Sequence, residues 1–127
     1  MLTREIPCGE WATFLEGFSR QHEGWLSSLE VLGSGFGAQT EARDLELQGI
    51  TVDLNSDTGN TIVIIFLGKD PKAHVTHTIS DPTHVRLQET AAGAHEALQI
   101  EAKDGVSALL RFRTAALPEL VDGVVAV

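Results

Sequence analysis

The sequence predicts an α+β domain in which one N-terminal helix packs on a strongly bent antiparallel β-meander or small β-barrel of about seven strands. Three observations predict it: a helical period in residues 8–22, a strand period in residues 25–113, and turn residues roughly every ten positions. A chain of 127 residues has the size of one domain. We therefore expect a single domain over residues 1–127, with an apolar C-terminal tail at residues 114–127.

The helix is predicted from the apolar side chains of residues 8–22. These side chains recur at positions i, i+3, i+4 and i+7, opposite charged side chains, and are Trp11, Phe14, Leu15 and Phe18. Pro7 suits the first turn of the helix, and Gly24 suits its end. Because the stripe is rich in aromatic rings, we expect it to pack on an extensive apolar surface.

Apolar and polar residues alternate after Gly24, as in strands with one buried face. The alternation covers residues 25–31, 44–47 and 50–54. Residues 62–67, Ile-Val-Ile-Ile-Phe-Leu, are instead apolar at every position, which is typical of a central strand covered on both faces. We expect the N-terminal helix to cover one of those faces.

A first hairpin is predicted from the rule that opposed residues share a face of the sheet. A three-residue loop, Asp81-Pro82-Thr83, would place Ser80 opposite His84 and His77 opposite Leu87. The following strands would then continue the meander.

A second hairpin is predicted around the loop Lys103-Asp104-Gly105. Gly105 suits the left-handed position that follows a type I turn in such loops. The loop sets one row of inward residues opposite another, namely Leu98, Ile100 and Ala102 opposite Leu110, Ala108 and Val106.

The charge and the cysteine content exclude several classes of partner and site. Eighteen acidic residues face nine basic ones, and the net charge is −9, so we expect neither nucleic acid nor a membrane surface as a partner. Cys8 is the only cysteine, which excludes an intrachain disulfide and a Cys-rich zinc site. With neither a signal-type apolar region nor an apolar run of about 18 residues, we expect a cytoplasmic protein.

One group of histidines suggests metal ligands. His74 and His77 lie close together in the sequence, and His84 lies beyond the predicted turn. However, residues 74 and 77 point to opposite faces of a strand, and His84 would lie at the far end of the hairpin. We therefore expect no metal site and no cofactor.

His77 is a candidate functional residue together with Glu89. Both side chains are expected on the inward face of the sheet, diagonal to each other on neighbouring strands. A half-buried His–Glu pair can act as a general acid and base or as a pH-sensitive latch. Since no nucleophile is placed beside the pair, the alternative of a core histidine held by a neighbouring acid is favoured.

Three arginines are expected to point outward on neighbouring strands, where they could bind an anion: Arg86, Arg111 and Arg113. The predicted register places Arg86 opposite Glu101, which gives it an ordinary cross-strand partner. A solvated, self-neutralising face of the sheet is therefore favoured over an anion site.

Two further features have a plain structural interpretation. Gly33, Gly35 and Gly37 form a G-x-G-x-G stretch, but a phosphate-binding loop should open a helix, and here another strand follows. We expect a flexible hairpin loop. Cys8 would be a redox sensor only if its thiolate lay at the helix N-terminus, and an incidental cysteine is favoured. The sequence has no G-x-S-x-G or H-E-x-x-H signature, so we assign no catalytic residue.

The function expected from the sequence is that of a non-catalytic, self-associating interaction module. The partner would be a second copy of the chain or another protein, since the apolar strand at 62–67 and the apolar tail require cover. The expected interface residues are in the tail: Leu117, Leu120, Val121 and Val124. The alternative is a small-molecule-binding protein or enzyme with a cleft around His77 and Glu89, in which Arg86 and Arg111 are further ligand-binding candidates.

Several motifs taken together resemble a known family. In the N-terminal part they are Ile6-Pro7, Glu10-Trp11, Phe14-Leu15, Phe18-Ser19-Arg20, His22 and Gly24-Trp25. Further along the chain they are Gly37-Ala38-Gln39, Glu41-Ala42-Arg43, His74-Val75-Thr76-His77-Thr78-Ile79, Leu110-Arg111-Phe112-Arg113 and Leu117-Pro118-Glu119. They resemble a small bacterial family described only as a domain of unknown function, built of a helix and a β-meander. The resemblance implies a bacterial origin and assigns no activity.

Overall fold

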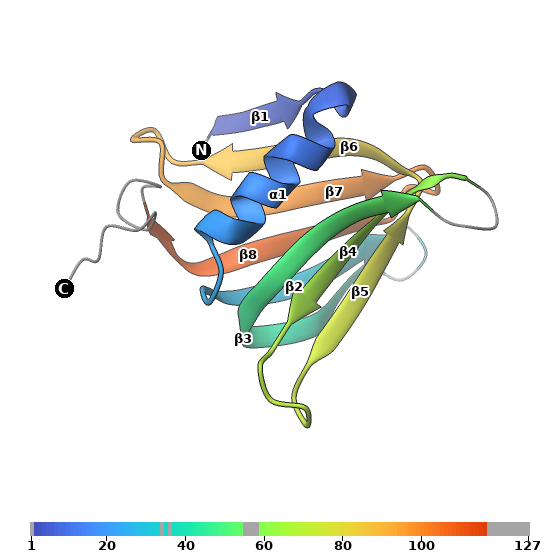
Figure 1. Ribbon diagram of the computed structural model, residues 1–127. Helices are drawn as coiled ribbons and strands as arrows, with labels where there is room; N and C mark the ends of the chain where they lie inside the picture. Colours follow the sequence, from blue (N-terminus) through green and yellow to red (C-terminus); the bar gives the residue numbers. More distant parts are fainter. Residues whose placement is uncertain (1, 34, 36, 55–58, 117–127) are drawn as a thin grey trace.

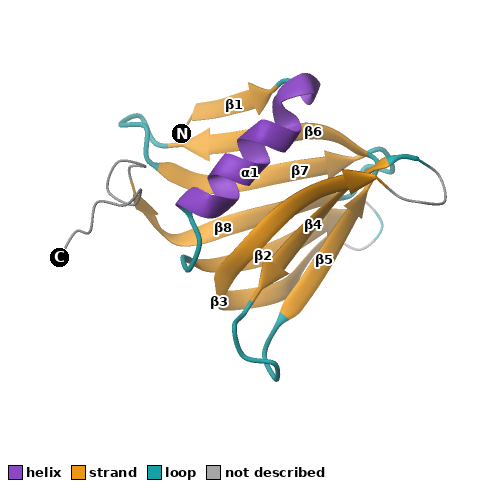
Figure 2. Cartoon of the chain, viewed as in Figure 1, coloured by secondary structure: helices purple, strands orange, loops and turns teal. Residues whose placement is uncertain are grey.

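The computed structural model describes residues 2–33, 35, 37–54 and 59–116, which form a helix packed on a bent antiparallel sheet (Figures 1 and 2). The N-terminal elements are β1 (Leu2–Ile6), a 3₁₀ turn (Cys8–Glu10) and the helix α1 (Trp11–Gln21). The strands that follow are β2 (Leu26–Gly33), β3 (Gly37–Leu54), β4 (Thr61–Leu67), β5 (Val75–Ser80), β6 (Pro82–Glu89), β7 (His95–Ala102) and β8 (Ser107–Ala116). The predicted α+β class and N-terminal helix are confirmed.

The sheet has eight strands in the order β1-β6-β7-β8-β2-β3-β4-β5, so it is open and not a barrel in the described part of the chain. The eighth strand is β1, which the sequence pattern did not predict and which pairs with β6. Two meanders, β2–β5 and β6–β8, are joined by the pairing of β2 with β8. The sheet bends along the 18-residue strand β3, whose first half pairs with β2 and whose second half pairs with β4.

The predicted hairpin between β5 and β6 is wrong. β5 pairs with β4, and β6 pairs with β1 and β7, so β5 and β6 are not neighbours. The chain turns between them at Asp81, which has a φ of 54°. Its N–H donates to Thr61 O at 3.0 Å, and its carbonyl accepts from Lys103 N at 2.9 Å. Asp81 is therefore the corner at which the chain passes from one meander to the other.

The two other predicted loops are confirmed as hairpins. Gly105 has a φ of 88° at the β7–β8 turn, and Leu98 faces Leu110 across it. Gly33 faces Gly37 across the β2–β3 turn, so the glycine-rich stretch joins two strands and opens no helix.

The helix buries the predicted stripe against the sheet. Trp11, Leu15 and Phe18 are buried, and Trp11 Nε1 donates to the carbonyl oxygen of Ile6 at 3.0 Å. The hydroxyl of Ser19 accepts from the backbone N–H of Ile50 at 2.9 Å. That N–H lies on β3 beyond the segment that pairs with β2, so the helix satisfies a backbone donor that no strand reaches.

The apolar strand β4 has one buried face and one half-exposed face. Val63, Ile65 and Leu67 are in the core. The opposite face, formed by Ile62, Ile64 and Phe66, is half-buried, and no described helix or strand covers it. The expectation of cover on both faces is therefore wrong for the described residues. None of the described helices is long and apolar enough to span a membrane.

Candidate functional site

The free edge of β5 is the first candidate site. β5 ends the sheet on one side, and no described strand pairs with its outer edge (Figure 1). Its sequence, Val-Thr-His-Thr-Ile-Ser, has no Lys, Arg, Asp, Glu or Pro. Burial lowers the pKa of His77, the one titratable group, although the Glu41 carboxylate acts in the opposite direction. The strand is thus neutral at pH 7.

The opposite edge of the sheet, β1, has the features that proteins use to protect an edge strand. β1 has five residues and is followed by Pro7. Arg4 lies 3.4 Å from a carboxylate oxygen of Glu89, and Glu5 accepts from Arg86 at 3.1 Å. A charged edge discourages the addition of another strand, whereas the neutral β5 has no such protection.

The outer face beside β5 carries a short apolar stripe. Ile62, Ile64 and Phe66 of β4 are bordered by hydroxyl side chains of β5, since Phe66 faces Thr76 and Ile64 faces Thr78. On the other side Ile64 faces Thr51 of β3. The stripe is therefore one strand wide and flanked by small polar side chains.

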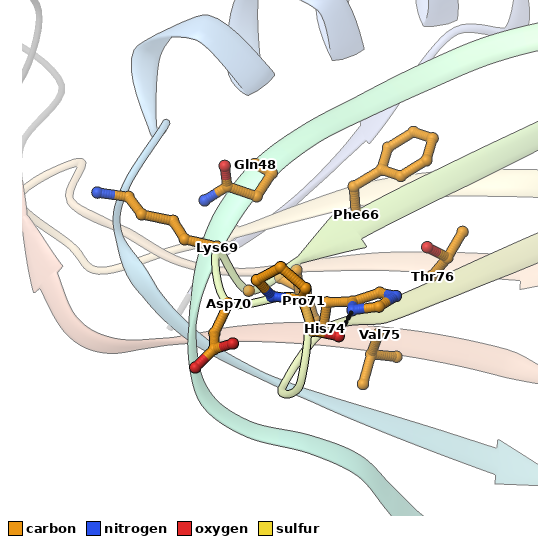
Figure 3. A pocket seen from close by; sticks show the side chains of 10 residues that line it. Gln48, Phe66, Lys69, Asp70, Pro71, His74, Val75 and Thr76 are labelled. Atoms are coloured by element: carbon orange, nitrogen blue, oxygen red, sulfur yellow. Dashed lines mark hydrogen bonds between the residues drawn. The ribbon is translucent and has the colours of Figure 1, made fainter.

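A hollow of about 300 Å³ lies where the stripe meets the β4–β5 turn (Figure 3). Phe66 and Thr76 lie at one end of it, and Lys69 and Asp70 lie at the other (Figure 3). The Nδ1 atom of His74 is 2.8 Å from the carbonyl oxygen of Pro71, which holds the ring against the turn. The lining is mainly apolar and open to the surface, as at sites that accept a side chain of a partner.

His77 and Glu89, the pair expected from the sequence, are on strands that do not pair. His77 lines a smaller hollow of about 190 Å³ between β5 and the β7–β8 turn, together with Asp104. Glu89 lies beside a different histidine, with its Oε2 atom 3.9 Å from Nε2 of His95. The structure thus gives Glu89 a histidine neighbour that the sequence analysis did not identify.

His95 and a second histidine, His22, form the other candidate site. His22 follows α1 and is completely buried, and His95 begins β7 and is 7% exposed. Their rings are joined by a 2.9 Å hydrogen bond between Nδ1 of His95 and Nε2 of His22. The ring of His22 stacks on Phe112 at 4.9 Å and meets Trp25 edge-on at 4.4 Å.

The hydrogen bonds fix where the protons of the two neutral rings lie. His22 Nδ1 is 2.8 Å from the carbonyl oxygen of Phe18, and a carbonyl can only accept, so this nitrogen carries the proton. His22 Nε2 is then an acceptor, and Nδ1 of His95 donates to it. The remaining nitrogen of His95, Nε2, is left with a lone pair.

Burial keeps both histidines neutral at pH 7. Burial lowers the pKa of His22 to about 4, although the hydrogen bond to Phe18 acts in the opposite direction. Burial also lowers the pKa of His95, which Glu89 partly opposes. His95 is thus a neutral imidazole with an unprotonated Nε2.

A hollow of about 410 Å³ lies beside His95, between α1 and β1. Its apolar walls include Phe14 and Phe18. Two cations, Arg4 and Arg20, also line it, and their side chains are largely exposed. Figure 1 shows the C-terminal end of α1 lying over the beginning of β7.

Arg86 and Arg111, for which a self-neutralising face was favoured over an anion site, have separate carboxylate partners. Arg86 donates to Glu101 at 2.9 Å, as expected, although Gln99 and not Glu101 is its opposed residue. Arg111 lies 3.6 Å from Glu30. Arg86 is on β6 and Arg111 is on β8, with β7 between them, so they do not form a common patch.

Cys8 is exposed in the turn before α1. The described residues contain no group of three side chains suited to hold a metal ion. The interface residues expected in the tail, Leu117, Leu120, Val121 and Val124, lie outside the described residues.

The sequence contained a signal for His22 but none for His95. His22 lies four positions after Phe18 and so continues the buried stripe of the helix, where a histidine must find polar partners. His95 lies 73 residues from His22 and follows a turn, and no local pattern links the two.

The chain belongs to a family of unknown function, DUF5335, whose model matches residues 2–120. The resemblance noted from the sequence motifs is thereby confirmed. No curated protein and no solved structure matches the chain.

Proposed function

We propose that this member of a family of unknown function is a non-catalytic interaction module that self-associates by pairing β5 with β5 of a second copy. The observation that carries the proposal is the contrast between the two edges of the sheet. β1 is charged, whereas β5 is neutral and rich in β-branched residues. An unprotected edge presents unpaired N–H and C=O groups to any matching strand.

A second copy is the partner that best fits this edge. The outer face of β5 carries Thr76, Thr78 and Ser80, which are all exposed. When two such strands pair in antiparallel fashion with their faces matched, hydroxyl side chains of one copy lie opposite hydroxyl side chains of the other. Cross-strand pairs of this kind stabilise a sheet by roughly 0.2–1 kcal/mol each. Two copies, each with a net charge of −9, repel each other. Pairing through the neutral β5 edge brings the fewest charges together at the interface.

The proposal is tested by light scattering on the full chain and on two lysine variants. Thr78→Lys places a charge on the exposed face of β5, next to its own copy in a paired dimer, and we expect the mass to fall from two chains to one. Thr3→Lys makes the same change on an exposed position of β1 and should leave the dimer intact. A wild-type mass of one chain over the whole concentration range would overturn the proposal.

We place this module in the bacterial cytoplasm, in agreement with the sequence-based expectations. The alternative function is the binding of a small molecule. His77 and Glu89 no longer support it, because they lie on strands that do not pair. It is instead favoured by the hollow beside His95, which is independent of the β5 edge.

A further inference from the structure

The hollow beside His95 has this buried histidine at its inner end and two exposed cations, Arg4 and Arg20, at its rim. His95 lines it with a side chain that is 9% exposed, and Glu89, with a side chain 21% exposed, stands 3.9 Å from His95 Nε2. The side chains of Arg4 and Arg20 are 56% and 75% exposed. A volume of about 410 Å³ falls within the range of small-molecule sites.

The inner end requires a hydrogen-bond donor. Nε2 of the neutral His95 carries a lone pair, because its Nδ1 proton is committed to His22. The Glu89 carboxylate, which is not part of the lining, is a second acceptor 3.9 Å from that nitrogen. Two acceptors 3.9 Å apart cannot bond to each other, but both can accept from a group with several N–H donors, such as an ammonium.

The rim supplies donors for an anion. Arg4 lies 3.4 Å from Glu89, and Arg20 lies 3.5 Å from Glu16 on the next turn of the helix. Both separations exceed the usual 2.7–3.2 Å of a hydrogen bond, so these pairs leave guanidinium donors for a further partner. Each arginine of the lining is thus opposed by a nearby carboxylate, Glu89 for Arg4 and Glu16 for Arg20, and neither carboxylate lines the hollow itself.

We propose that this hollow binds a free α-amino acid, with its ammonium group on His95 and Glu89 and its carboxylate on Arg20 and Arg4. A zwitterion matches a site that offers acceptors for its ammonium group and guanidinium donors for its carboxylate. The rings of Phe14 and Phe18 provide an apolar wall for the side chain of the amino acid. The inference does not rest on the self-association proposed above.

The test is a titration of the full chain with L-alanine, followed through the ring signals of His95 in NMR spectra. We expect a saturable shift of these signals. Propionate lacks the ammonium group, ethylamine lacks the carboxylate, and lactate replaces the ammonium with a hydroxyl. Because each change removes at least one charge-assisted hydrogen bond, all three should bind at least about tenfold more weakly than alanine.

Two variants locate the carboxylate. Arg20→Gln should raise the dissociation constant for alanine about tenfold, and it changes an exposed helix position, so the fold is retained. Arg43→Gln removes the same charge from an exposed position on β3 that does not line the hollow, and it should change nothing. The proposal is overturned if alanine gives no saturable shift, if any of the three analogues binds as well as alanine, or if Arg20→Gln binds alanine normally.

Discussion

His95 donates a hydrogen bond from Nδ1 to Nε2 of His22 at 2.9 Å, joining the end of the helix to the beginning of β7. Through His22 the connection continues to the carbonyl oxygen of Phe18. Three of the four ring nitrogens are thus hydrogen-bonded inside an aromatic cluster, two to each other and one to the Phe18 carbonyl, and the fourth faces Glu89 and the adjoining hollow. The arrangement depends on both rings being neutral, and this has consequences that can be measured.

The stability of the protein should fall as the pH falls from 6.5 to about 4. His22 has its ordinary pKa of 6.5 in the unfolded chain and a pKa of about 4 in the folded protein, so between these values the unfolded state binds more protons. The stabilisation is complete above pH 6.5 and is lost as the pH falls to the folded pKa. The loss from His22 is roughly 3 kcal/mol. Urea unfolding at several pH values measures it.

The control for this prediction is His22→Phe, which removes the titrating group but retains an aromatic ring beside Phe112. It should be less stable at pH 7 by roughly 1–3 kcal/mol, because Nδ1 of His95 loses its acceptor. Its stability should depend less on pH than that of the wild type. His74→Asn changes an exposed histidine in the β4–β5 turn and is the matched control for the loss of an imidazole. Equal slopes in the wild type and His22→Phe would contradict the prediction.

The tautomers of the two histidines should be directly visible. At pH 7 both rings should carry their proton on Nδ1, with Nε2 unprotonated, because the Phe18 carbonyl can only accept. Nitrogen chemical shifts from long-range ¹H–¹⁵N spectra distinguish the two ring nitrogens. A proton on Nε2 of His22 would contradict the hydrogen-bond chain and would remove the lone pair required for the ligand site.

Gly68 should be irreplaceable at the start of the β4–β5 turn. Its φ is 90°, and a Cβ atom would overlap the carbonyl oxygen of Ala73 and lie 2.9 Å from Cα of His74. Gly68→Ala should therefore lower the free energy of unfolding by about 2–4 kcal/mol. Gly17→Ala is the contrasting change, because a Cβ there meets nothing within 4 Å and the residue is helical. It should raise stability by about 0.5–1 kcal/mol. Thermal or urea unfolding distinguishes the two, and equal effects would contradict the prediction.

The features that were predictable from the sequence are those with a local cause. The aromatic stripe of α1 follows from its period, and the β7–β8 hairpin follows from Gly105 and the matched rows beside it. The long-range pairings have no such cause, because β2 with β8 and β1 with β6 join segments far apart in the chain. The same applies to the site: His77 and Glu89 looked adjacent only because β5 and β6 were assumed to pair.

Asp81 is the residue at which the chain leaves the expected hairpin. Aspartate tolerates its φ of 54° better than most residues, and a β-branched residue tolerates it least. Asp81→Val should therefore destabilise the fold by at least about 1–2 kcal/mol, whereas Asp81→Gly should be close to neutral. Both variants keep the backbone bonds to Thr61 and Lys103, so the difference isolates the conformational cost. Urea unfolding of the two variants measures this difference. If valine and glycine proved equally stable at this position, Asp81 would not be the strained corner that separates β5 from β6.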